Sequence, residues 1–111
     1  MEISVKSLND VKVVDLKGNL DTNTTPAAQE YVDKLLQDGA TKLLINFEKV
    51  DYVSSSGLRL LLGTAKKLKS SGGELRVCTL NKVVQEVFDI SGFSGILNVF
   101  KSETEAIEKF S

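Results

Sequence analysis

The chain has 111 residues, 14 of them basic and 15 acidic, and its formal net charge is −1. This length predicts one domain spanning residues 1–111, and the balanced charge argues against a nucleic-acid partner. There is no histidine and one cysteine, Cys78, which excludes the Ser-His-Asp and Cys-His nucleophile pairs and the usual zinc-ligand sets. The counts of histidine and cysteine do not exclude hydrolysis by carboxylates or the binding of Mg²⁺.

The first part of the chain predicts a hairpin, a helix and a buried strand. Residues 2–8 and 11–18 are rich in β-branched and apolar side chains and flank a short Asn-Asp turn, which predicts two antiparallel strands. A helix is expected over 25–38, with Thr25 as its N-cap, because a proline suits the first turn and a glycine follows the end. Residues 42–47 have a continuous apolar centre, typical of a strand covered on both faces.

A second helix is expected over 56–70, where apolar side chains recur at helical spacing. Its predicted buried face consists of Leu58, Leu61, Leu62, Ala65 and Leu68. Leu60 lies off this face, beside Thr64 and Lys67, and we expect it to be exposed. Gly63 next to it leaves a flat spot, and Arg59 also points outward, so this side of the helix is a plausible contact surface for a partner.

The rest of the chain continues to alternate. The expected elements are a strand over 74–80, a helix from the Asn81 cap to about residue 91 with Val83, Val84, Val87 and Phe88 inward, a strand over 96–100, and a short helix that begins at Ser102 and contains Ile107 and Phe110. Cys78, Tyr52 and Phe93 are expected to serve packing. The whole pattern predicts an α/β fold, with a mixed, mostly parallel sheet, an N-terminal hairpin and about four helices.

Three consecutive serines, Ser54, Ser55 and Ser56, stand between the strand and the second helix. A serine at such a junction is usually an N-cap. The segment also follows the carboxyl end of a predicted parallel strand, where α/β sheets tend to bind ligands and partners. The start of a helix favours an attached phosphate electrostatically. The residue pattern alone is therefore compatible with two roles for these serines, a helix cap and a chemical site.

Two stretches of the sequence match patterns of a known family: "NFEKVDYVSSSGLRLLL", residues 46–62, and "LKGNLDTNT", residues 16–24. With these motifs and the order of its elements, the chain resembles the STAS domains of bacterial anti-sigma-factor antagonists. The resemblance implies a single STAS domain whose unphosphorylated form binds an anti-sigma factor that is also a serine kinase, and so frees a sigma factor. Phosphorylation of a serine would end this binding, and a serine phosphatase would reset the switch.

The resemblance also implies residue roles. It makes Ser55 the phosphorylated residue, with Ser54 and Ser56 as alternatives. Together with the helix surface described above, the expected partner-binding residues are Asp21, Ser54, Ser56, Gly57, Arg59, Leu60 and Gly63. Two positions depart from the family pattern. Ser54 replaces the motif's aspartate, and Asn46 replaces the carboxylate usual in the preceding strand. In the family, the two acidic residues would help to shape the loop and its contacts with the kinase.

Two other functions compete with this interpretation. One is a STAS scaffold or sensor component of a larger signalling complex. The other is a small nucleotide-binding enzyme that uses the serine segment, which the lack of histidine and of a phosphate-binding glycine-rich motif argues against. We expect no enzymatic activity, no cofactor, no metal and no membrane partner. A monomer in the cytoplasm is expected, since no secretory signal or membrane-spanning run is present and a lone cysteine fits a reducing compartment.

Overall fold

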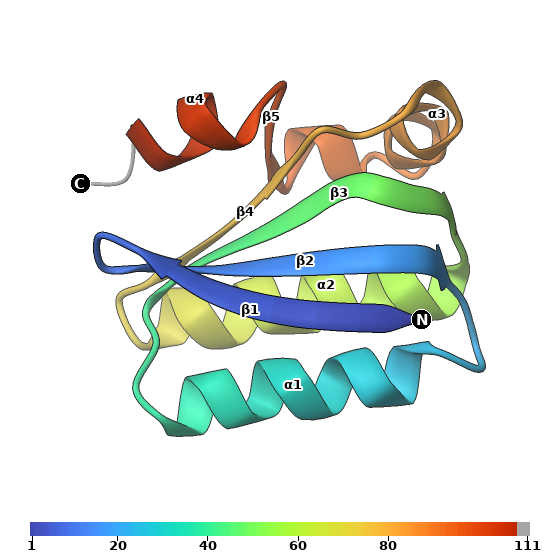
Figure 1. Cartoon of the computed structure of the whole chain (residues 1–111). Coiled ribbons are helices and arrows are strands. Elements are labelled where there is room, and N and C mark those ends of the chain that lie inside the picture. Colours follow the sequence, from blue (N-terminus) through green and yellow to red (C-terminus); the bar gives the residue numbers. More distant parts are fainter. Residues whose placement is uncertain (109–111) are drawn as a thin grey trace.

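The structure, a computed structural model, describes residues 1–108 and consists of one five-stranded sheet with helices on both faces (Figure 1). The strands are β1 (Glu2–Leu8), β2 (Val11–Leu20), β3 (Lys42–Val53), β4 (Glu74–Cys78) and β5 (Asn98–Phe100). The helices are α1 (Thr25–Gln37), α2 (Ser55–Ser70), α3 (Lys82–Ile90) and α4 (Glu103–Glu108), with a short 3₁₀ turn, η1 (Phe93–Gly95). The predicted order of elements is confirmed.

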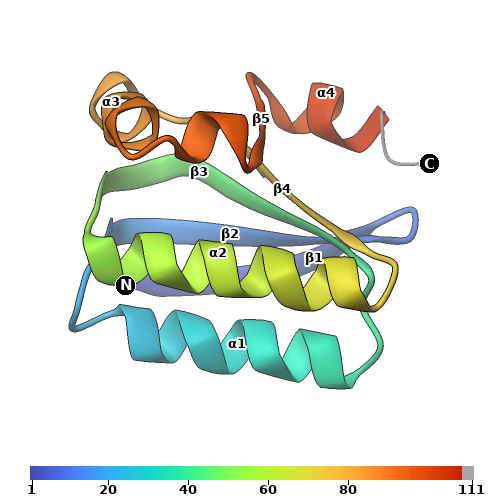
Figure 2. The same ribbon diagram turned by 180° about the vertical axis from the view of Figure 1, so that it is seen from behind.

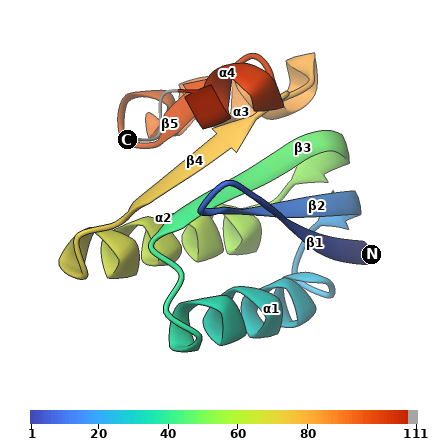
Figure 3. The ribbon, with the colours of Figure 1, turned by 60° about the vertical axis from the view of Figure 1, so that its left-hand side comes forward.

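The sheet has the strand order β1-β2-β3-β4-β5. β1 pairs antiparallel with β2, and the other pairs are parallel. This confirms the predicted mixed α/β fold with an N-terminal hairpin. Helices α1 and α2 lie side by side across one face (Figure 2), and α4 lies on the other, against β3, β4 and β5 (Figure 3).

Strand β3 divides the core in two. Its side chains alternate between the faces, so Leu43, Ile45 and Phe47 join the larger core with α1, α2 and α3. Leu44 joins a smaller cluster that includes Cys78 of β4 and a residue of α4. All five residues from Leu43 to Phe47 are buried, which confirms the prediction of a strand covered on both faces. Cys78 is a core residue as expected, and its burial raises the pKa of its thiol.

Strand β3 runs six residues beyond its predicted end and reaches Val53. Val50 and Val53 of this extension are buried and pair with Gly18 and Leu20 of β2, across irregularities in the register. The polar residues between these valines face solvent, so the sequence pattern does not look like a strand there. As a consequence, β3 leads into the serine segment without an intervening loop.

The prediction that Leu60 is exposed is wrong, because its side chain is only 5% exposed and belongs to the larger core. Helix α2 packs on α1 as well as on the sheet, so it buries two sides instead of one. Thr64, one turn after Leu60, is 2% exposed. Lys67, on the same side, forms an ion pair with Asp33 of α1 at 3.5 Å. The side of α2 that was expected to face solvent therefore faces α1.

Smaller differences concern single residues near element ends. Val83, predicted to point inward, is 51% exposed, and Tyr52, predicted to serve packing, is 47% exposed. Helix α1 begins at Thr25 with Thr24 in the cap position, one residue earlier than predicted. The last strand begins at Asn98 instead of residue 96.

Other local predictions are confirmed. Asn81 caps α3, since the amide of Val84 donates to its side chain at 2.8 Å. Phe93 packs edge-on against Phe88. Ser102 accepts a hydrogen bond from the Glu105 amide at the start of α4; Phe110, expected in the same helix, lies outside the described residues. No helix within residues 1–108 has the combined length and apolar character needed to span a membrane.

Candidate functional site: the serine loop

Ser54 is the N-cap of α2. Its backbone is extended, and the amide of Gly57 donates a long hydrogen bond of 3.5 Å to its hydroxyl oxygen. The Ser54 amide donates to the carbonyl of Leu20 at 2.9 Å, which ties the start of the helix to the end of β2. A cap of this kind contributes about 1 kcal/mol. The structural role that the sequence allowed for one of the serines thus falls to Ser54.

Ser55 is the first residue of α2 and is exposed. Within residues 1–108, nothing hydrogen-bonds to its hydroxyl group. Ser54 and Ser56 differ in both respects, because each is half-buried and its hydroxyl has a partner. Among the three serines, Ser55 is therefore the one whose oxygen is most accessible to an incoming reagent.

The segment after β2 lies against the serine loop and is held by Asp21. One carboxylate oxygen of Asp21 accepts hydrogen bonds from the amides of Asn23 and Thr24 at 2.9 and 3.1 Å. This places Thr22, whose hydroxyl lies 3.2 Å from that of Ser56. Asp21 thus shapes the loop beside the serines. Thr22 was missed, since its contact with Ser56 depends on two segments that are distant in sequence.

At Gly57, α2 lies close against the ends of β2 and β3. A Cβ atom on this glycine would lie 2.9 Å from side-chain carbons of Leu20 and Val53, at the ends of β2 and β3. Real Cβ atoms do not come this close to carbon. A glycine is therefore required here for packing. Its close contact sets the distance between the sheet and the first turn of α2, which carries Ser55.

We expect Gly57→Ala to lower the free energy of unfolding by about 1–3 kcal/mol, because the added methyl group must displace Leu20 and Val53. Urea denaturation measures this. Gly63→Ala is the matched control: it is in the same helix with no atom within 4 Å of the added Cβ, and alanine should stabilise the helix by up to about 1 kcal/mol. Equal stabilisation by both substitutions would contradict the close approach at Gly57.

The expected partner-binding residues thus fall into three groups. Ser54, Ser56 and the buried Gly57 lie at the start of α2, beside the loop that Asp21 holds. Arg59 is exposed one turn further along, and Gly63 is half-buried with open space above it. Leu60 is excluded from an exposed contact surface by its burial.

Asn46 has no part in the serine loop. It lies seven residues before Val53 in β3, which corresponds to roughly 20 Å along a strand. Its amide nitrogen donates to Glu103 at 3.2 Å, and its oxygen accepts from the amide of Glu48 at 2.9 Å. The residue at this position therefore connects β3 with α4, and the expected effect of Asn46 on the serine loop is not supported by its location.

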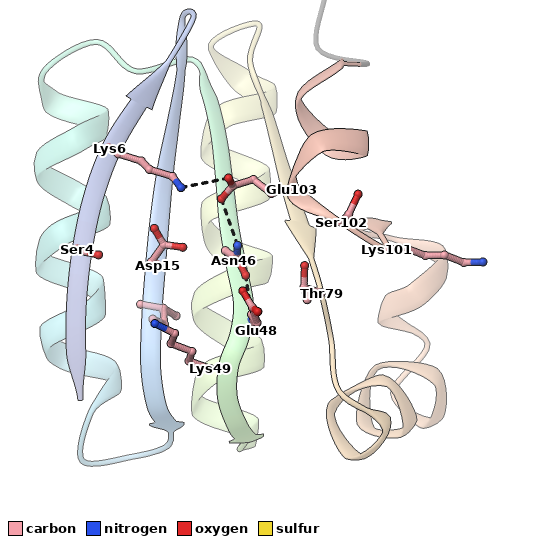
Figure 4. A pocket seen from close by; sticks show the side chains of 11 residues that line it. Ser4, Lys6, Asp15, Asn46, Glu48, Lys49, Thr79, Lys101, Ser102 and Glu103 are labelled. Carbon is pink, nitrogen blue, oxygen red and sulfur yellow. Dashed lines mark hydrogen bonds and ion pairs between the residues drawn. The ribbon is translucent and has the colours of Figure 1, made fainter.

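Asn46 lines a polar pocket of about 530 Å³ on the sheet face opposite α1 and α2 (Figure 4). Lys6 of β1 and Asn46 both reach Glu103, and the Lys6–Glu103 distance is 3.1 Å. The hydrogen bond with Glu103 raises the pKa of the Lys6 ammonium group. The pocket holds lysines and carboxylates in equal number: Lys6, Lys49, Lys101, Asp15, Glu48 and Glu103. Within the described part of the chain, no three acidic or sulfur side chains converge as metal ligands would.

Comparison with known proteins identifies the class to which this fold and serine loop belong. The model of the STAS domain family matches residues 2–106. The chain belongs to the STAS domain family.

Named relatives place it more narrowly. An anti-sigma-B factor antagonist of Staphylococcus aureus is 30% identical over 101 residues, covering 89% of this chain and 94% of the relative. The unphosphorylated form of the anti-sigma factor antagonist SpoIIAA is 26% identical, with a TM-score of 0.84 and coverage of 97% of this chain and 95% of that one. The phosphorylated form of SpoIIAA from Bacillus is 25% identical, with a TM-score of 0.76 and coverage of 97% and 98%.

Proposed function

We propose that this chain is an anti-sigma-factor antagonist. Its unphosphorylated form binds an anti-sigma factor that is also a serine kinase, and this binding frees a sigma factor. The similarity to antagonists of this class over nearly the whole chain supports the role. The observation that carries the proposed switch is the exposed hydroxyl of Ser55 at the start of α2, beside two serines that are engaged in the fold.

Phosphorylation of Ser55 is the proposed off-switch. The kinase transfers the γ-phosphoryl group of ATP to the Ser55 oxygen; the bond to ADP breaks and the hydroxyl proton is released. The phosphate adds about −1.5 to −2 charges near pH 7. A partner that closes over the neutral loop would then have to bury an unmatched charge, which costs several kcal/mol. SpoIIAA, which shares this fold, has been characterised in both an unphosphorylated and a phosphorylated form.

The switch needs no rearrangement of the fold. Ser55 projects from the first turn of a helix whose start is fixed by the Ser54 cap and the close packing of Gly57. The partner surface that we propose comprises Ser55, Ser56, Arg59 and Gly63, with the Asp21 loop at its edge. In this proposal the domain is a monomeric binding protein of the cytoplasm and has no enzymatic activity. A serine phosphatase removes the phosphate and restores binding.

The experiment is incubation with Mg·ATP and a candidate anti-sigma kinase from the same genome, followed by intact-mass measurement. We expect one phosphate on the chain without substitutions and none on Ser55→Ala. Ser54→Ala and Ser56→Ala are matched controls that keep Ser55 and should still be phosphorylated. Equal phosphorylation of Ser55→Ala would refute Ser55 as the acceptor, and a phosphate gained without the kinase would indicate an enzyme.

A further inference from the structure

Arg59 is the cation of α2 nearest to Ser55 along the helix. Residues four apart lie on the same side of a helix, with Cβ atoms about 5–6 Å from each other. Both residues are exposed. In the described part of the chain, the Arg59 guanidinium has neither a hydrogen bond nor an ion pair. Lys67 differs, because it pairs with Asp33 of α1.

We propose that Arg59 binds the phosphate carried by Ser55, so that the phosphorylated chain forms an ion pair with itself. This inference rests on the proposed phosphorylation of Ser55. A guanidinium group donates two parallel hydrogen bonds to a phosphate, which a lysine ammonium does not. An anion that precedes a cation by four residues is the favourable order in a helix. The carboxylate of Asp21 does not compete, since it is engaged by its own loop.

The pair changes what phosphorylation does to the surface. In the unmodified chain, Arg59 offers an unpaired positive charge to a carboxylate of the partner. In the phosphorylated chain, the same guanidinium is held by the phosphate. Phosphorylation then has two effects: it adds about −1.5 to −2 charges at Ser55, which one guanidinium offsets only in part, and it withdraws a cation one turn away. Arg59 is in this view a specificity-determining residue of the switch.

The test uses the full chain with phosphoserine installed at residue 55 during translation, so that no kinase is needed. Phosphorus NMR follows the second ionisation of the phosphate, whose pKa is ordinarily about 6. A neighbouring guanidinium favours the dianion, so we expect this pKa to lie about half a unit or more lower with Arg59 than in Arg59→Gln. Arg59→Lys keeps the charge without the paired donors and should fall between them.

Lys66→Gln is the matched control. It removes the same charge from an exposed position of α2, eleven residues beyond Ser55 and therefore about 16 Å along the helix. It should leave the phosphoserine pKa unchanged. The same phosphoserine pKa with Arg59 in place and in Arg59→Gln, or an equal shift in Lys66→Gln, would overturn the pair. The titration requires no anti-sigma factor, so it distinguishes a failure of the Arg59 pair from a failure of the proposed function.

Discussion

Replacing Leu60 by alanine should lower the free energy of unfolding by about 2–5 kcal/mol, the usual cost of truncating a buried leucine. Leu60 is 5% exposed in the core shared by α1, α2 and the sheet. The surrounding structure usually relaxes only in part around such a truncation, which leaves a cavity. Urea denaturation with a common slope for both proteins measures the difference.

Lys66→Ala controls for changes in helix propensity and charge on the same helix. Lys66 is exposed, and substitutions at such positions are usually within about 0.5 kcal/mol of neutral. If Leu60→Ala also fell within that range, the side of α2 that contains Leu60 would have to face solvent. The contact between α1 and α2 would then be wrong.

Replacing Ser55 by glutamate should weaken binding of the anti-sigma factor about tenfold or more, which corresponds to ~1.4 kcal/mol. A carboxylate adds one charge at the place where the phosphate would add nearly two, so its effect is smaller than that of the phosphate. Ser55→Ala should retain the affinity of the unmodified chain, because the loop stays small and neutral. Isothermal titration calorimetry with the purified anti-sigma factor measures all three affinities.

Ser70→Glu is the control for net charge. Ser70 is exposed at the far end of α2, about 22 Å from Ser55 along the helix, and its substitution should change the affinity little. Equal binding by Ser55→Glu and the unmodified chain would show that charge at Ser55 does not exclude the partner. Equal weakening by both glutamates would point to long-range repulsion instead of a local contact.

The fold could be predicted from the sequence where one residue pattern dominates. The continuous apolar centre of β3 indicated a strand covered on both faces, and Leu43 to Phe47 are indeed all buried. The pattern failed where an element has two neighbours. A single apolar stripe assumes one buried side, whereas α2 contacts both α1 and the sheet, so that Leu60 and Thr64 are also buried.

The residue pattern located the candidate site without separating its three serines, and only the family resemblance singled out Ser55. The three adjacent serines are chemically alike, and the structure supplies a physical difference between the cap, Ser54, and the exposed Ser55. The bond between Thr22 and Ser56 joins residues 34 apart, and no local pattern predicts such a contact. The distance of Asn46 from the serine loop likewise follows from the length of β3, which the sequence pattern underestimated.

The central claim is that a phosphate on Ser55 prevents binding of the anti-sigma factor. Its most direct test is a calorimetric titration of that factor with two forms of the chain, one carrying serine and the other phosphoserine at residue 55. The account predicts that the phosphorylated form binds at least about a hundredfold more weakly, a difference of ~3 kcal/mol. Equal affinities of the two forms, or tighter binding of the phosphorylated form, would contradict it.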